Sequence, residues 1–218
     1  LIVSNYFTYR DNKRYGIEIL EADNFNVEVW DLSKILSPKT APEIKKTSSK
    51  PFSTEVKRYT RMSQVLKSIK KENKKTFFIT MIMYSYSTMS LFKSISKYGF
   101  EYGATGPYTV DFVPHLGNSS ESYSIFNRKL STLFKAVLNR IASKKKIMKL
   151  LGIKSAIFFF ASGGAKVNAK GPIISDETIL IQGPSSDFDF FHSHCFENNS
   201  QEYILFLDQY IPFHPDFK

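Results

Sequence analysis

The sequence predicts an α/β protein with a Rossmann-like, doubly wound and mostly parallel sheet that is flanked by helices. Two observations carry this prediction. Short apolar runs alternate along the chain with longer segments whose apolar residues recur every three or four positions, as buried parallel strands and their covering helices do. Turn-forming Gly and Pro stand between many of these segments. There is no internal repeat of fixed period, so a solenoid or a propeller is not expected.

The first strand-helix-strand unit is predicted at the start of the chain. Leu1 to Ser4 predicts a buried strand, Tyr15 to Ala22 a helix, and Asn26 to Leu32 a second strand with alternating valines. Ser33 to Thr54 contains three prolines among Lys, Ser and Thr residues. This composition predicts a long connection rather than a packed element.

The middle of the chain repeats the alternation. A helix is predicted from about Thr54, because apolar residues recur at helical spacing. These residues are Val56, Tyr59, Met62, Leu66 and Ile69. A strand over Thr76 to Met83, a helix over Ser87 to Tyr98 that Gly99 ends, and a strand over Phe100 to Thr105 are expected to follow.

The longest predicted helix covers Glu121 to Leu151, with a break near Ser143 and an end at Gly152. Its apolar residues keep a helical period. They are Ile125, Phe126, Leu130, Leu133, Phe134, Val137, Leu138 and Ile141. The last three predicted strands are Ser155 to Ala161, Thr178 to Gln182 and Tyr203 to Leu207.

Charge is distributed unevenly along a chain whose net charge is +10. The segment Arg128 to Lys149 is strongly basic, whereas residues 176–218 contain eight acidic residues and a single lysine. A basic run is usually a solvated face of the protein. If the run has a function, the one we expect is contact with an anionic membrane surface. We do not expect nucleic acid to be the partner, because the chain has none of the usual binding signatures.

The sequence predicts a cytoplasmic protein, with peripheral contact at the inner membrane through the basic segment. No apolar run reaches the about 20 residues that a bilayer span needs, and residues 1–6 lack the basic start of a secretory signal. The single cysteine, Cys195, excludes an internal disulfide.

Ligands of a doubly wound sheet collect where strands end, so the predicted strand ends are the candidate sites. After the first strand we expect Asn5 and Arg10 to contact substrate. After the strand that ends at Ala161, a second group with two glycines and a lysine is suited to phosphate contact or to a plain tight turn. This group is Ser162, Gly163, Gly164 and Lys166. The chain contains neither a P-loop nor a G-x-G-x-x-G motif, so no bound nucleotide cofactor is expected.

Acidic and histidine residues near the end of the chain are the candidates for catalysis. Asp187 and Asp189 have the D-x-D spacing of some metal-dependent transferases, but a solvated helix start explains them better because a turn precedes them. His192 and His194 stand two residues apart, a spacing that does not share a helical face, so we expect acid-base chemistry there and no metal.

A family resemblance rests on the strand-Asp-aromatic-Pro-His-Pro-Asp stretch at residues 203–217, together with the strands at 2–5 and 27–32. These segments resemble bacterial lipopolysaccharide and capsule biosynthesis proteins related to two-domain, GT-B type glycosyltransferases. The resemblance implies that residues 1–200 are the acceptor-side Rossmann-like domain. Residues 201–218 are then the linker to, or the first strand of, a donor-binding domain that this sequence does not include.

The resemblance also implies an activity and further site residues. The reaction would transfer a sugar from a nucleotide-sugar co-substrate to an anionic or phosphorylated saccharide acceptor, without a cofactor or metal. Asp208, His214 and Asp216 would lie at the cleft between the domains, where a carboxylate or a histidine acts as base. The alternative to a site at this cleft is that the segment has only a structural role, in which Pro212 and Pro215 make a rigid turn. The alternative function is a non-catalytic Rossmann-like binding or scaffold protein.

Overall fold

The computed structural model describes residues 1–38, 53–105, 137–138, 140–141, 144–162 and 172–183. Their strands form one seven-stranded sheet in the order β3-β2-β1-β4-β5-β6-β7, and every neighbouring pair is parallel. The strands are β1 (Ile2–Val3), β2 (Glu28–Asp31), β3 (Glu55–Arg58), β4 (Phe78–Thr80), β5 (Tyr102–Thr105), β6 (Phe158–Ser162) and β7 (Ile179–Gly183). The predicted Rossmann-like α/β fold is therefore confirmed.

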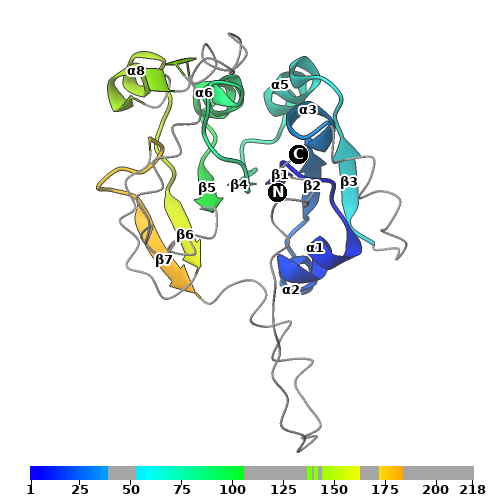
Figure 1. Ribbon diagram of the computed structural model, residues 1–218. Coiled ribbons are helices and arrows are strands. Elements are labelled where there is room, and N and C mark those ends of the chain that lie inside the picture. Colours follow the sequence, from blue (N-terminus) through cyan, green and yellow to red (C-terminus); the bar gives the residue numbers. More distant parts are fainter. Residues whose placement is uncertain (39–52, 106–136, 139, 142–143, 163–171, 184–218) are drawn as a thin grey trace, which may run out of the picture.

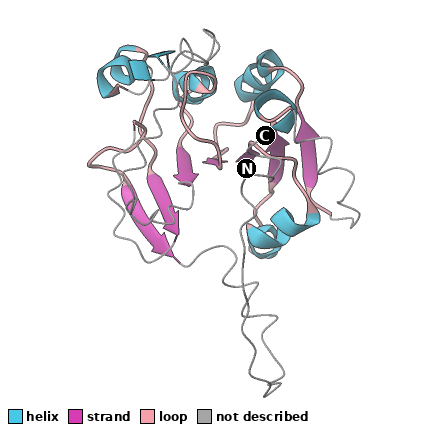
Figure 2. Ribbon diagram, in the orientation of Figure 1, coloured by secondary structure: helices cyan, strands magenta, loops and turns pink. Residues whose placement is uncertain are grey.

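The path of the chain explains why helices cover both faces of the sheet. The chain steps outward from β1 to β3, returns to place β4 beside β1, and then steps outward in the other direction. Right-handed crossovers in opposite directions place their helices on opposite faces. Accordingly, α1 (Tyr9–Arg14) and α2 (Ile17–Ala22) lie on one face (Figures 1 and 2). The other face carries α5 (Met62–Lys71), α6 (Met89–Lys97) and α8 (Lys145–Leu150). The short helix α3 (Ser33–Leu36) directly follows β2 and also packs against the core on this face, which the direction of its crossover does not explain.

The larger hydrophobic core lies between the sheet and the helices α5, α6 and α8. Aromatic rings run through it in edge-on contacts: the centroid of Phe78 lies 5.5 Å from that of Trp30 and 5.3 Å from that of Phe100. A smaller cluster, with Phe7 and Ile17 as its large members, fills the space under α1 and α2. Burial of both faces by apolar side chains supplies the main driving force for this fold.

The helix predicted from Thr54 is wrong in its first part. Residues 55–58 form the edge strand β3, and the helix α5 begins only at Met62. The reason is a local cap: the Oε1 atom of Gln64 accepts the backbone N–H groups of Thr60 and Arg61, at 3.2 and 3.1 Å. This cap starts the helix at a residue that apolar spacing alone does not identify.

Two other predicted segments are divided differently in the structure. The helix predicted over residues 15–22 is α2, and a separate helix α1 precedes it, with Gly16 between them in the left-handed region at a φ of 61°. The connection predicted over residues 33–54 contains the short helix α3, whose first residue, Ser33, donates its N–H to the carboxylate of Asp31. Residues 39–52 lie outside the described part of the chain.

Later boundaries agree with the sequence more closely. Gly99 and Gly152 follow α6 and α8 with φ values of 79° and 68°, as expected for glycines that end helices. Lys144 is extended between helical residue 141 and α8, which confirms a break close to the predicted one. Most of the long helix predicted over 121–151 and the strand predicted over 203–207 lie outside the described residues. Within the described residues, no helix is both long and apolar enough to cross a membrane.

Candidate functional site

The topology of the sheet identifies one place where a ligand is expected. The strand β1 lies between β2 and β4, and the connections that leave β1 and β4 lead to α1 and α6 on opposite faces of the sheet (Figure 1). In open parallel sheets, ligands bind at the carboxyl ends of the strands at such a switch point. The candidate site therefore comprises the segments after β1 and β4 and the strand ends beside them.

The connection after β1 differs from a dinucleotide-binding turn. It contains no glycine between Ser4 and Thr8. The start of the helix that follows it, α1, is capped by hydrogen bonds between its own residues. The carboxylate of Asp11 accepts the backbone N–H of Thr8 at 2.9 Å and its hydroxyl at 2.7 Å. Because an internal carboxylate already occupies the start of α1, this turn is not suited to a nucleotide pyrophosphate.

Asp31, at the carboxyl end of β2, ties three neighbouring strand ends together. Its carboxylate is buried and accepts the N–H of Phe7 at 3.2 Å and that of Ser33 at 2.9 Å. The register of the sheet pairs Asp31 with Arg58 at the end of β3, and the Arg58 Nε lies 3.5 Å from the carboxylate. A buried carboxylate with two charge-assisted hydrogen bonds and an ion pair makes this part of the edge rigid.

Arg58 is a cation whose position at this edge is fixed by its neighbours. Its guanidinium lies over the ring of Tyr6, 4.8 Å from the centroid, and 37% of its side chain is exposed. Guanidinium has five N–H donors, and Nε is the atom that pairs with the carboxylate of Asp31. Arg58 is therefore held in position by Asp31 and Tyr6 and retains donors for an external anion. By contrast, the ammonium group of its neighbour Lys57 donates to Glu28, which raises the pKa of Lys57.

The connection after β4 presents a different surface. The buried Thr88 holds it, because its hydroxyl accepts the N–H of Ser85 at 2.8 Å and donates to the carbonyl of Met83 at 2.9 Å. Met83 and Tyr86 are left at the surface, with 64% and 47% of their area exposed. This side of the switch point thus presents apolar and aromatic groups, whereas the β1 side presents Arg58.

The predicted substrate contacts come from two parts of the sheet. Asn5 is exposed in the connection after β1, and Arg10 is exposed on α1, the helix that follows this connection. Ser162 ends β6, which is three strands away from β1 in the sheet. At about 4.8 Å per strand this separation is roughly 14 Å. Ser162 therefore lies at the same edge of the sheet as the end of β1, two strands beyond β4, and its contact with substrate stays a prediction.

The remaining predicted residues lie outside the described part of the chain. They are Gly163, Gly164, Lys166, His192, His194, Asp208, His214 and Asp216. Among the described residues, no group of three or more His, Cys, Asp or Glu side chains is arranged to hold a metal ion.

The residues that matter most at this edge were not predicted from the sequence. Tyr6, Asp31 and Arg58 come from three segments that are 25 or more positions apart from one another. One signal was present: an acidic residue at the end of the second strand is typical of ligand-binding Rossmann-like domains. Arg58 could not be found because residues 55–58 were predicted as helix, which hides the register that places it beside Asp31.

Fold and site together define a Rossmann-like α/β protein with a positioned arginine beside its switch point. Comparison of the chain with models of protein families, with curated proteins and with solved structures found no match.

Proposed function

We propose that this chain is the acceptor-binding half of a glycosyltransferase. The protein would transfer a sugar from a nucleotide-sugar donor in the assembly of a bacterial surface polysaccharide, such as lipopolysaccharide or capsule. The observation that carries the proposal is Arg58, which Asp31 and Tyr6 hold at the carboxyl edge of the sheet. An arginine fixed in this way is suited to the phosphate or carboxylate of an anionic saccharide.

The closed turn after β1 supports the assignment of this half to the acceptor. Asp11 satisfies the start of α1, so nothing at this turn is suited to the diphosphate of a sugar nucleotide. The donor would bind to a second domain, of the kind that residues 203–217 resemble. The exposed Met83 and Tyr86 give the same site an apolar surface, against which the less polar face of a sugar ring can pack.

In the proposed reaction, the acceptor hydroxyl attacks the anomeric carbon of the donor sugar, and the bond from that carbon to the nucleotide diphosphate breaks. A base accepts the hydroxyl proton. The candidates for the base are His192, His194, Asp208, His214 and Asp216. Arg58, with Asn5 and Arg10 from the segment that follows β1, would bind and orient the acceptor rather than take part in bond breaking.

The test uses the natural polypeptide that carries this chain, a panel of labelled nucleotide sugars and a phosphorylated saccharide acceptor. Arg58→Gln should raise the KM for the acceptor by about 10-fold or more, as expected for the loss of a charged hydrogen bond, while hydrolysis of the donor without acceptor stays unchanged. Arg58→Lys, which keeps the charge but not the fork, should give a smaller effect.

Lys93→Gln is the matched control, because it removes the same charge from an exposed position on α6. Equal effects of Lys93→Gln and Arg58→Gln would contradict a role for Arg58 in binding the acceptor. Binding of the acceptor without turnover of any nucleotide sugar would instead support the non-catalytic binding or scaffold protein.

A further inference from the structure

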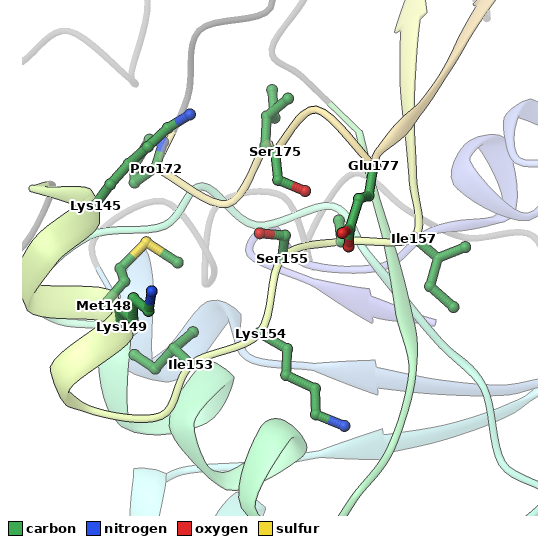
Figure 3. A pocket seen from close by; sticks show the side chains of 12 residues that line it. Lys145, Met148, Lys149, Ile153, Lys154, Ser155, Ile157, Pro172, Ser175 and Glu177 are labelled. Carbon is green, nitrogen blue, oxygen red and sulfur yellow. The ribbon is translucent and has the colours of Figure 1, made fainter.

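A second candidate site lies at the amino ends of the strands, opposite the carboxyl ends at which the switch point lies. A pocket of about 520 Å³ is lined by α8 and by the segments that lead into β6 and β7 (Figure 3). Because these segments precede their strands, the pocket lies at the amino ends of the strands. It is therefore separate from the switch point, and a ligand could bind there whether or not the chain belongs to a transferase.

The polar residues of the pocket favour an anion. Lys145 and Lys149 on α8 and Lys154 before β6 contribute three positive charges, and Glu177 is the acidic residue of the lining. Among the described residues, none of the three lysines forms an ion pair. In the view of Figure 3, Ser155 and Ser175 are seen between the lysines of α8 and Glu177. Lysine ammonium and serine hydroxyl groups are donors of the kind that phosphate oxygens accept.

The walls of the pocket are held in place by hydrogen bonds to β5, to α6 and between the segments that precede β6 and β7. The hydroxyl of Tyr102 donates to the carbonyl of Lys154 at 2.8 Å, and the N–H of Lys154 donates to the hydroxyl of Ser96 at 2.9 Å. The hydroxyl of Thr178 donates to the carbonyl of Ala156, also at 2.9 Å. Segments fixed in this way lose little freedom when a ligand binds.

Apolar residues around the pocket indicate which class of phosphate-containing ligand fits it best. Met148 and Ile153 are buried in its lining, whereas Leu150, one residue after Lys149, is 81% exposed. Ile157 at the rim is also exposed. A soluble phosphate ester or a nucleic acid makes no use of an exposed leucine. A membrane surface uses both features, because it pairs lysines with anionic headgroups and accepts apolar side chains at the acyl boundary.

We propose that this pocket binds the phosphate of an anionic phospholipid headgroup, with Leu150 entering the membrane boundary beside it. The sequence predicts contact of the basic segment 128–149 with an anionic membrane. Within that segment we assign the contact to Lys145 and Lys149, and we add Lys154 from outside the segment. The membrane would then lie at the amino edge of the sheet and leave the carboxyl edge accessible.

The experiment measures binding of the full chain to vesicles of phosphatidylcholine mixed with phosphatidylglycerol, and to vesicles of phosphatidylcholine alone. Binding is expected only to the mixed vesicles. The triple variant K145Q/K149Q/K154Q should bind them on the order of 100-fold more weakly, at about fivefold for each lysine near the surface. The control K67Q/K70Q/K71Q removes the same charge from exposed positions on α5 and should keep most of the affinity.

Further variants and probes distinguish the lipid from other phosphate sources. Leu150→Ser should weaken binding to vesicles, and glycerol phosphate and a single-stranded RNA should compete poorly with them. Equal losses in the two triple variants would overturn the proposal, because binding would then depend on net charge alone. It would also be overturned by unchanged vesicle binding in Leu150→Ser, or by tighter binding of glycerol phosphate or RNA than of vesicles. All substituted side chains are exposed or partly exposed, and thermal unfolding checks that each variant folds.

Discussion

At the scale of single residues, buried polar side chains decide how the strand ends are positioned. Asp31 is buried, yet its two oxygens accept backbone N–H groups from Phe7 and Ser33 and face Arg58. Such a carboxylate is tolerated in a core region because each oxygen has a partner. The same arrangement turns Arg58 from a mobile surface residue into a positioned cation.

Tyr102 provides a prediction at this scale. Its ring is buried in the core and its hydroxyl donates to the carbonyl of Lys154. Burial raises the pKa of Tyr102 above its ordinary value, and the nearby Tyr84 adds to the shift. The folded chain therefore keeps this proton at a pH where the unfolded chain has lost it. Its contribution to stability is complete below a pH of about 10, the ordinary tyrosine pKa, and is lost as the pH rises further.

Tyr102→Phe should thus cost about 1 kcal/mol at neutral pH, through the lost hydrogen bond, and should make the loss of stability at alkaline pH less steep. The measurement is urea unfolding at a series of pH values. Tyr98→Phe, at a partly exposed position, serves as the control. A pH dependence that is equally steep in the wild type and in Tyr102→Phe would contradict the assigned role of the buried hydroxyl.

At the scale of elements, caps and registers set the boundaries that apolar periodicity leaves open. The edge strand β3 contains only one apolar residue, Val56, and is mostly exposed. Its pairing with β2 and the cap at Gln64 separate it from α5. Apolar residues at 56, 59 and 62 fit a helical spacing by coincidence, because two of them belong to the strand and the turn that precede the helix.

Gln64 provides the prediction at this scale. Gln64→Ala removes the acceptor for the N–H groups of Thr60 and Arg61, and should cost about 0.5–2 kcal/mol of unfolding free energy. Gln64→Glu keeps the acceptor and places a negative charge near the positive start of α5, so its stability should equal or exceed that of the wild type. Chemical denaturation of the three proteins checks the order, and an alanine variant as stable as the wild type would exclude a role for the cap.

At the scale of the whole molecule, the sheet is most protected at its centre. Ile2 and Thr80, in β1 and β4, are fully buried, whereas all four residues of β3 are at least partly exposed. In β7, Ile179, Leu180 and Ile181 are exposed among the described residues. We therefore expect local stability to be highest in the central strands β1 and β4 and to decrease toward the edge strands β3 and β7.

Hydrogen exchange of the backbone amides tests this distribution. Amides at the centre of the sheet should exchange at rates set by global unfolding. One of them is that of Met81, directly after β4, which donates to the carbonyl of Ile2 at 2.8 Å. Amides of β3 and β7 should exchange faster by orders of magnitude, because edge strands open locally. Uniform protection across all seven strands would show instead that β3 and β7 open together with the centre.

Much of the fold could be predicted from the sequence, and less of the site. Apolar runs such as Phe77 to Thr80 and Phe158 to Ala161 identify strands because the strands of a parallel sheet are covered, at least in part, on both faces. The glycines Gly99 and Gly152 identify helix ends because few other residues adopt their φ. Asn5 and Arg10 could be named as candidates because they lie in the segment directly after a predicted strand, and the end of a strand can be recognised from neighbouring residues alone. Tyr6, Asp31 and Arg58 were missed because their contact depends on pairing between strands.

The sequence by itself determined the alternation of strands and helices, the parallel sheet and several helix ends, since these depend on apolar periodicity and on the conformational limits of single residues. Only the tertiary structure decided that Arg58 stands beside Asp31, that Ser162 lies roughly 14 Å from β1, and that Lys149 and Lys154 line the same pocket as Glu177. Strand order and register are set by long-range burial and hydrogen bonding, and no local pattern records which distant segments those forces bring together.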